Sequence, residues 1–237
     1  MTASTRRLCS VYLRDDRAVV EWRKMRSTNP IPDDLWPHDM SITIEERSHA
    51  LLKLLWIREA YDLRPDGDDL PPSLDVSPRD DLAGVPSAAE RAEWTAAWPS
   101  LWASTLAHAG KDFDRALHER LSQTSNGSPE RLHLLQEIVG PSWRDRFGPG
   151  ALDHNSYREW NDTVQAKFAA RPAGVEGEAL RRDLDAVIGA WRTGMTRIVT
   201  IPCLGEYTRR VGDNALLITE QMMASSDAFR RALSAFR

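Results

Sequence analysis

Residues 87–106 read SAAERAEWTAAWPSLWASTL, and this stretch decides the fold class. Ser87 and Glu90 have the spacing of a capping box, in which each side chain satisfies a backbone amide that the first helical turn leaves without a partner. Apolar residues follow at helical intervals. The stretch therefore predicts a long helix, with a kink or a restart at Pro99, because proline removes a backbone hydrogen bond and clashes with the preceding turn.

Three tryptophans of this helix recur every fourth residue and share one face: Trp94, Trp98 and Trp102. One interpretation is a helix face that is buried in the core. The alternative is a surface that binds a partner, because tryptophan is prominent among the residues that dominate protein interfaces. We expect Trp98 and Trp102 to be buried and Trp94 to be the most exposed, since it lies nearest the polar first turn.

Further helices are expected along most of the chain. Apolar periodicity or capping residues predict helices that begin near Thr43, Asp112, Ser128, Ser156, Leu180 and Ser226. The first of them rests on the capping-box spacing of Thr43 and Glu46, and the fourth on the same spacing of Ser156 and Glu159. Helical segments therefore dominate the predicted architecture.

Strand patterns occur near the two ends of the chain. A hairpin is expected at residues 8–23, with a helix over 19–25 as the alternative, and a meander of short strands is expected at 198–219. A hairpin alone is marginal in water, whereas three or more strands packed on helices can be stable. We therefore expect a mainly α (α+β) fold, with a helical core and a small antiparallel sheet built from N-terminal and C-terminal strands.

The chain is long enough for one large domain with a buried core, so residues 1–237 are expected to form a single domain. Residues 62–86 interrupt the helices with seven Asp, five Pro and few large apolar side chains. Such a composition buries too little apolar surface to offset the entropy lost on ordering. We therefore expect a flexible surface loop at 62–86.

The composition excludes several classes of protein. With 41% hydrophobic and 28% charged residues, the chain is neither disordered nor fibrous. Two cysteines, Cys9 and Cys203, are too few for a disulfide scaffold or a Cys-rich zinc module, and they fit a reducing compartment. No apolar run approaches the roughly 20 residues that span a bilayer, and no signal-peptide stretch follows Arg6 and Arg7. We expect a cytoplasmic protein without a membrane partner.

The net charge of −4 is unevenly distributed along the chain. Residues 1–26 carry +4 and residues 192–237 carry +3, so the middle carries −11. An acidic balance argues against a general nucleic-acid binder, whereas the basic ends leave room for a phosphorylated ligand or nucleic acid bound locally. Tyr207, Arg209 and Arg210 are the candidate anion-binding residues, because arginine pairs with phosphate or carboxylate through two parallel hydrogen bonds.

A repeated Glu-x-x-His motif is the candidate metal site. It occurs as Glu46 with His49 and again as Glu130 with His133. On a helix, residues three apart share one face, and paired motifs of this kind hold iron or manganese in carboxylate-bridged helical bundles. The competing interpretation is that both glutamates serve the first turns of helices, where capping and the helix dipole favour them. Under that interpretation the protein binds no cofactor.

The motifs of nucleotide, dinucleotide and serine-hydrolase chemistry are missing, since the sequence contains no GxxxxGK[ST], no GxGxxG and no GxSxG. No catalytic residue is therefore assigned. We expect a non-enzymatic binding or regulatory protein that contacts another protein through its tryptophan-rich helices or its basic terminal sheet. A metal-dependent helical enzyme and a binder of phosphorylated ligands or nucleic acid are the alternatives.

Overall fold

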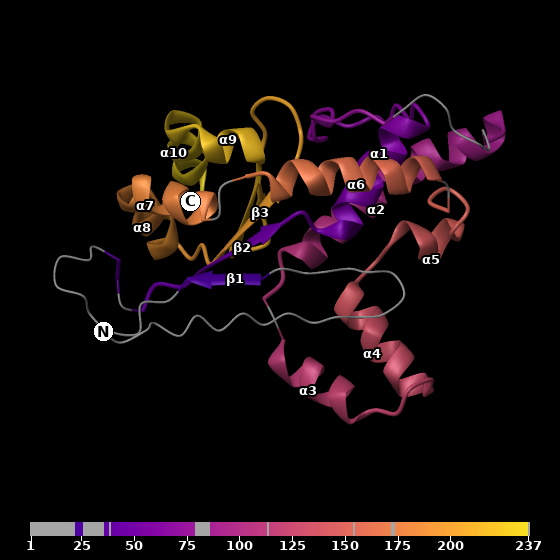
Figure 1. The fold of residues 1–237 in the computed structure, drawn as a ribbon, viewed down its shortest axis with the longest axis horizontal. Helices are drawn as coiled ribbons and strands as arrows, with labels where there is room; N and C mark the ends of the chain where they lie inside the picture. Colours follow the sequence, from indigo (N-terminus) through magenta and orange to yellow (C-terminus); the bar gives the residue numbers. More distant parts are fainter. Residues whose placement is uncertain are drawn as a thin grey trace. The chain divides into compact units, whose positions relative to one another are not determined.

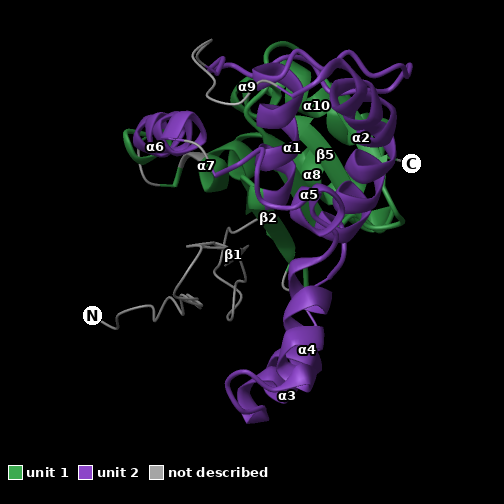
Figure 2. Cartoon of the chain, turned by 90° about the vertical axis from the view of Figure 1, so that its right-hand side faces the viewer, with its two compact units in different colours: residues 1–49, 168–237 green, residues 50–167 purple. Residues whose placement is uncertain are grey.

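The chain divides into two compact units, which Figure 2 distinguishes by colour. Met1–His49 and Phe168–Arg237 form the sheet unit, and Ala50–Lys167 form the helical unit. The computed structural model describes residues 22–25, 36–37, 39–78, 86–112, 114–153, 155–171 and 174–236. A single domain over the whole chain stays a prediction.

Five strands within the described residues form one sheet in the sheet unit, in the order β1-β2-β3-β5-β4. Their bounds are Trp22–Met25 (β1), Ile42–Glu46 (β2), Arg197–Ile201 (β3), Thr208–Val211 (β4) and Ala215–Thr219 (β5). Strands from both ends of the chain therefore share one sheet, while helices make up most of the rest (Figure 1). The predicted mainly α (α+β) class is confirmed.

The sheet is mixed, whereas the sequence pattern predicted an antiparallel meander. Strands β2, β3 and β5 run parallel, and β1 and β4 pair antiparallel at the two edges. Strand β5 lies between β3 and β4, so the C-terminal strands form no meander. Burial accounts for this order: every residue of β3 and β5 is buried, so both strands need covered neighbours, whereas the more polar β4 can occupy an edge.

Four helices cover one face of this sheet: α7 (Val175–Arg182), α8 (Leu184–Arg192), α9 (Glu220–Ala224) and α10 (Ser226–Ala235) (Figure 1). Their apolar side chains, among them Val187 and Phe229, pack in one core cluster with Ile44, Ile198 and Ile218 of the strands. Because successive strand residues point to opposite faces, these three isoleucines identify the covered face.

The first predicted helix start, at Thr43, is wrong. This segment is strand β2, and helix α1 begins at His49. Ile42 and Ile44 both belong to the core cluster, and this alternation is the pattern of a strand. Thr43 and Glu46 therefore form no capping box, and their spacing is coincidental.

The helical unit is built from α1 (His49–Ala60), α2 (Ala88–Ala109), α3 (Arg115–Gln123), α4 (Pro129–Val139), α5 (Trp143–Phe147) and most of α6 (Asn155–Ala169). The predicted start of α4 is confirmed, since Ser128 Oγ accepts a hydrogen bond from the amide of Arg131 at 3.2 Å. The predicted capping box of Ser156 and Glu159 is wrong, because Ser156 already lies inside α6. No helix in the described part of the chain is long and apolar enough to cross a membrane.

The expected N-terminal hairpin at 8–23 lies outside the described residues, apart from Trp22 and Arg23, which belong to β1. The alternative helix over 19–25 is wrong for its last four residues, because they form this strand. The described part of the expected loop at 62–86 ends at residue 78 and is irregular. The flexibility of that loop stays a prediction.

Candidate functional site

Two tryptophan side chains pack together on the buried face of α2. Trp98 and Trp102 are both buried, and their rings stack 5.3 Å apart with planes 8° from parallel. The indole N–H of Trp98 donates to the carbonyl of Leu54 in α1 at 2.8 Å. The predicted burial of both residues is confirmed, so neither ring offers a surface to a partner.

The start of α2 is fixed by the predicted capping box, which is confirmed. The amide of Glu90 donates to Ser87 Oγ at 3.2 Å, and the amide of Ser87 donates to Glu90 Oε2 at 2.9 Å. The hydrogen bonds from Ser87 hold the pKa of Glu90 below its ordinary value. The helix then continues to Ala109 through Pro99, so a restart at this proline does not occur, and the alternative, a kink, stays a prediction.

Trp94 is half-buried and belongs to an aromatic cluster. Its ring meets Tyr61 and Trp143 edge to face, each at 5.2 Å, and lies 6.1 Å from Phe147. The expectation that Trp94 is the most exposed of the three tryptophans is confirmed. Trp98 and Trp102 are buried and cannot contact a partner. Partner binding by this helix face therefore stays a prediction for Trp94 alone.

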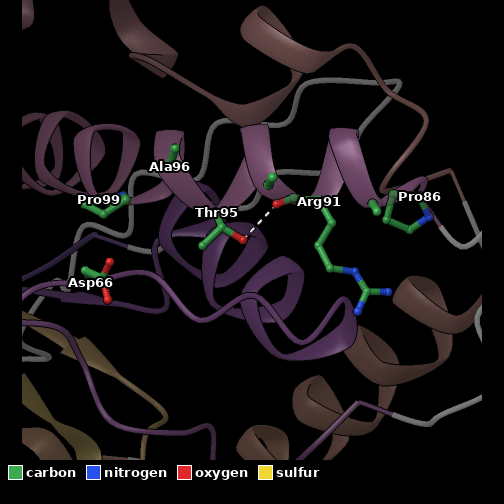
Figure 3. A pocket seen from close by; sticks show the side chains of 8 residues that line it. Asp66, Pro86, Arg91, Thr95, Ala96 and Pro99 are labelled. Carbon is green, nitrogen blue, oxygen red and sulfur yellow. Dashed lines mark hydrogen bonds between the residues drawn. The ribbon is translucent and has the colours of Figure 1, made fainter.

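A groove runs along another side of the first half of α2 (Figure 3). Its volume is about 710 Å³, which is within the range of ligand-binding sites in proteins. Small or short side chains of α2 form its floor: Ala88, Ala92, Thr95, Ala96 and Pro99. Arg91, Asp66 and Pro86 complete the lining.

The groove wall that faces α2 is represented in the described lining by Asp66, a residue of the irregular segment 62–78, which Arg58 of α1 anchors. The Nη atoms of Arg58 donate to the carbonyls of Pro71 at 2.5 Å and Pro72 at 2.7 Å. The same guanidinium lies over the Trp98 ring, 5.4 Å from its centroid. One buried side chain therefore ties the wall of the groove to the core beneath α2.

Three more contacts fasten this segment to helices α1 and α6. They join the Leu74 amide to Glu59 Oε1 (2.5 Å), the Trp160 indole N–H to the Val76 carbonyl (2.7 Å), and Lys167 Nζ to Asp75 Oδ2 (2.5 Å). The described part of the Asp- and Pro-rich stretch is thus irregular in conformation but attached at several points. It positions Asp66, which lines the groove from outside α2.

The groove carries opposite charges toward its two ends. In Figure 3, Asp66 lies on the side of Pro99, whereas the guanidinium of Arg91 extends toward Pro86. Among the residues that the structure describes, neither Asp66 nor Arg91 has an ion-pair partner. The Thr95 hydroxyl between them is occupied, because it donates to the carbonyl of Arg91 at 2.8 Å. The site therefore presents two charges separated by a largely apolar floor.

The described lining of the groove contains two titratable side chains, the carboxylate of Asp66 and the guanidinium of Arg91. The small side chains of the floor, among them Ala92 and Ala96, lie between these two charges.

A second hollow, of about 550 Å³, lies where α2 and α4 end. Its lining comprises His108, Lys111, Gln136, Glu137, Gly140, Pro141 and Asp145. His108 Nε2 donates to the carbonyl of Ile138 at 2.9 Å. Gly140 has φ of +75°, and a Cβ atom there would lie 2.3 Å from the His108 ring. The histidine therefore serves the packing of two helix ends.

The two Glu-x-x-His motifs do not form equivalent helix faces. Glu46 is the last residue of β2 and His49 is the first of α1, so the helical geometry predicted for this motif is wrong. Glu130 and His133 lie exposed in α4. No group of three His, Cys, Asp or Glu side chains within the described residues is arranged to hold a metal ion. Iron or manganese binding stays a prediction without an assigned site.

The predicted anion-binding residues lie at the edge strand β4. Tyr207 precedes this strand, and Arg209 and Arg210 point to opposite faces, because they pair with consecutive residues of β5. The Arg210 guanidinium lies 4.6 Å from the centroid of the Phe236 ring and donates to two carbonyls of the β4–β5 turn, at 3.3 Å each. Arg210 therefore has structural contacts, and anion binding by these residues stays a prediction.

A buried ion pair in the sheet was not anticipated from the sequence. Glu45 Oε2 accepts a hydrogen bond from Arg197 Nη1 at 3.0 Å across the neighbouring strands β2 and β3. Burial raises the pKa of Glu45 to about 7, although Arg197 acts in the opposite direction. The two residues are 152 positions apart in the sequence, so no local pattern could have indicated them.

Sequence reasoning also missed the groove. A signal existed, because Ala88, Ala92 and Ala96 recur every fourth residue on a face separate from the tryptophans. The wall that carries Asp66 becomes visible only in three dimensions. No protein-family model, no curated protein and no solved structure matches the chain.

Proposed function

We propose that this protein is a non-enzymatic binding protein that contacts another protein through the groove along α2. The observation that carries the proposal is the make-up of the groove, which combines a floor of small side chains with one charge toward each end. A segment of the partner would lie along the floor and bury its apolar side chains against it. The interaction requires neither a metal nor a cofactor.

The rigidity of the groove supports this proposal. Binding costs less conformational entropy when the receiving surface is already ordered. Beneath the floor, the stacked Trp98 and Trp102 and the hydrogen bond to Leu54 hold the inner face of α2. Ser87 caps the start of the helix, and Arg58 holds the opposite wall. The groove is therefore formed before a partner arrives.

A regulatory role in the cytoplasm is part of the proposal. The chain has two cysteines, Cys9 and the buried Cys203 that follows β3, and this sparse cysteine usage fits a reducing compartment. Under this proposal the protein acts by occupying a partner surface or by holding that partner in place. Regulation through protein contacts is the role that such a groove serves.

A groove-filling substitution tests the proposal. Ala92 lies exposed in the floor, so Ala92→Trp fills the groove without touching the core. Ala103→Trp is the matched control, because Ala103 is exposed on the same helix and does not line the groove. The probes are peptides selected on the parent protein from a phage-displayed library of random dodecapeptides. Their affinities for the three proteins are measured by fluorescence anisotropy.

We expect Ala92→Trp to weaken the selected peptides at least about tenfold, which corresponds to about 1.4 kcal/mol. Ala103→Trp should bind them as the parent does, because its new side chain lies outside the groove. Circular dichroism checks that both variants are folded. If folded Ala92→Trp binds every selected peptide with the affinity of the parent, the groove is not the binding site and the proposal is wrong.

A further inference from the structure

We propose that the two ends of the α2 groove carry opposite charges, and that the groove selects a partner segment whose own two ends carry opposite charges. An acidic group of the partner would lie at Arg91, and a basic group would lie at Asp66. This inference rests on the proposed function, since it assigns the partner of the same groove. It adds the chemical class of that partner, a segment with a carboxylate, a short apolar stretch and a cation in sequence.

The end of the groove near Pro86 carries the positive charge of its lining. The guanidinium of Arg91 extends toward it, and no described residue forms an ion pair with this side chain (Figure 3). Glu90 at the same helix start does not line the groove, and its carboxylate accepts hydrogen bonds from Ser87. Arg91 is therefore the lining charge that favours an anion, and a carboxylate is the anion that a polypeptide offers.

The end near Pro99 is electronegative. Asp66 lines the groove there, and the exposed residues Asp68 and Asp69 follow it closely in the chain. Arg64 is the one basic residue of segment 62–70, and it already pairs with Asp62 at 3.0 Å. The net charge of this short segment is therefore −3. A lysine or arginine of the partner would be attracted to this end.

The apolar floor sets the spacing between the partner's charges. Arg91 and Pro99 are eight residues apart on α2, which corresponds to about 12 Å along the helix axis. An extended segment covers about 12 Å in roughly four residues, and a helical segment covers it in roughly eight. The acidic and basic residues of the partner should therefore be about four positions apart if extended, or about eight if helical.

Charge-exchange variants test this polarity. Arg91→Glu and Asp66→Lys each reverse one end, and the double variant exchanges the two ends. Arg120→Glu is the matched control, because Arg120 is an exposed arginine of α3 that does not line the groove. The dodecapeptide library is selected separately on the parent and on the double variant. The affinities of both peptide sets for all the proteins are measured at low and high salt.

Peptides selected on the parent should contain an acidic and a basic residue at one of the two spacings. Each single reversal should weaken them by about 2- to 5-fold, the size expected of an exposed charge pair, and high salt should reduce the difference. The double variant should select peptides in which the charges are exchanged relative to the apolar stretch. Arg120→Glu should bind the parent's peptides as the parent does.

The outcomes separate this inference from the proposed function. If Ala92→Trp abolishes binding but the charge reversals leave every affinity unchanged, the groove binds peptides and its proposed polarity is wrong. Selected peptides that carry only basic or only acidic residues would also overturn the polarity, because one end would then be unused. If Ala92→Trp has no effect either, the proposed function itself is wrong.

Discussion

Replacing Trp98 by alanine should destabilise the protein more than any other single change on α2. Trp98 is fully buried, so the substitution leaves a cavity, and truncating a buried tryptophan costs about 3–5 kcal/mol. The carbonyl of Leu54 would also lose its donor, which adds about 1 kcal/mol. The Arg58 guanidinium would lose the ring on which it lies. We therefore expect a loss of about 4–6 kcal/mol in the free energy of unfolding.

Urea denaturation of the full chain, followed by circular dichroism, measures this loss. With a slope of about 2 kcal/mol per molar urea, the midpoint should fall by about 2–3 M. Trp94→Ala is the control, because Trp94 is half-buried and its ring is partly exposed to water. Its replacement should therefore lower the free energy of unfolding about half as much. If Trp98→Ala and Trp102→Ala are both as stable as the parent, the assignment of these rings to the core is refuted.

Three further predictions concern pH, a glycine and proteolysis. Because burial raises the pKa of Glu45 to about 7 in the folded protein, its contribution to stability is complete below about pH 4.5 and is lost as the pH rises toward 7. Glu45→Gln should flatten this part of a stability–pH profile, and an unchanged profile would contradict the cause. Gly140→Ala should lower stability by about 2–3 kcal/mol, since its Cβ would meet the His108 ring at a positive φ, and His108→Ala should restore part of the loss in a double-mutant cycle. Brief trypsin treatment should cut first within 62–86, for instance after Arg79, whereas an earlier cut inside a helix would show that this loop is not the most mobile segment.

Features that depend on neighbouring residues could be predicted from the sequence. The capping box of Ser87 and Glu90 and the start of α4 at Ser128 each involve residues within one helical turn, and both are present. The same local reasoning failed at Thr43, because a strand of five residues is too short for its alternation to outweigh a chance capping pattern. Local patterns predict an element well only when the element is long enough to repeat its period.

Features that depend on distant residues could not be predicted in this way. The position of β5 between β3 and β4 follows from the burial of whole strands, which the sequence of one strand does not reveal. The same holds for the pairing of Glu45 with Arg197 and for the position of Asp66 opposite α2. Each of these arrangements exists only once the chain has brought separate segments together.

The manner in which Arg58 holds its loop has a consequence for how the groove can change in evolution. The arginine binds the carbonyl groups of Pro71 and Pro72, which belong to the backbone and persist whatever side chains the loop carries. Asp66, which we propose contacts the partner, is exposed and takes no part in this attachment. Substitutions at Asp66 and its exposed neighbours can therefore alter which partner is preferred while the wall keeps its place. Attachment and recognition are assigned to different atoms of one loop, so specificity can diverge without loss of folding.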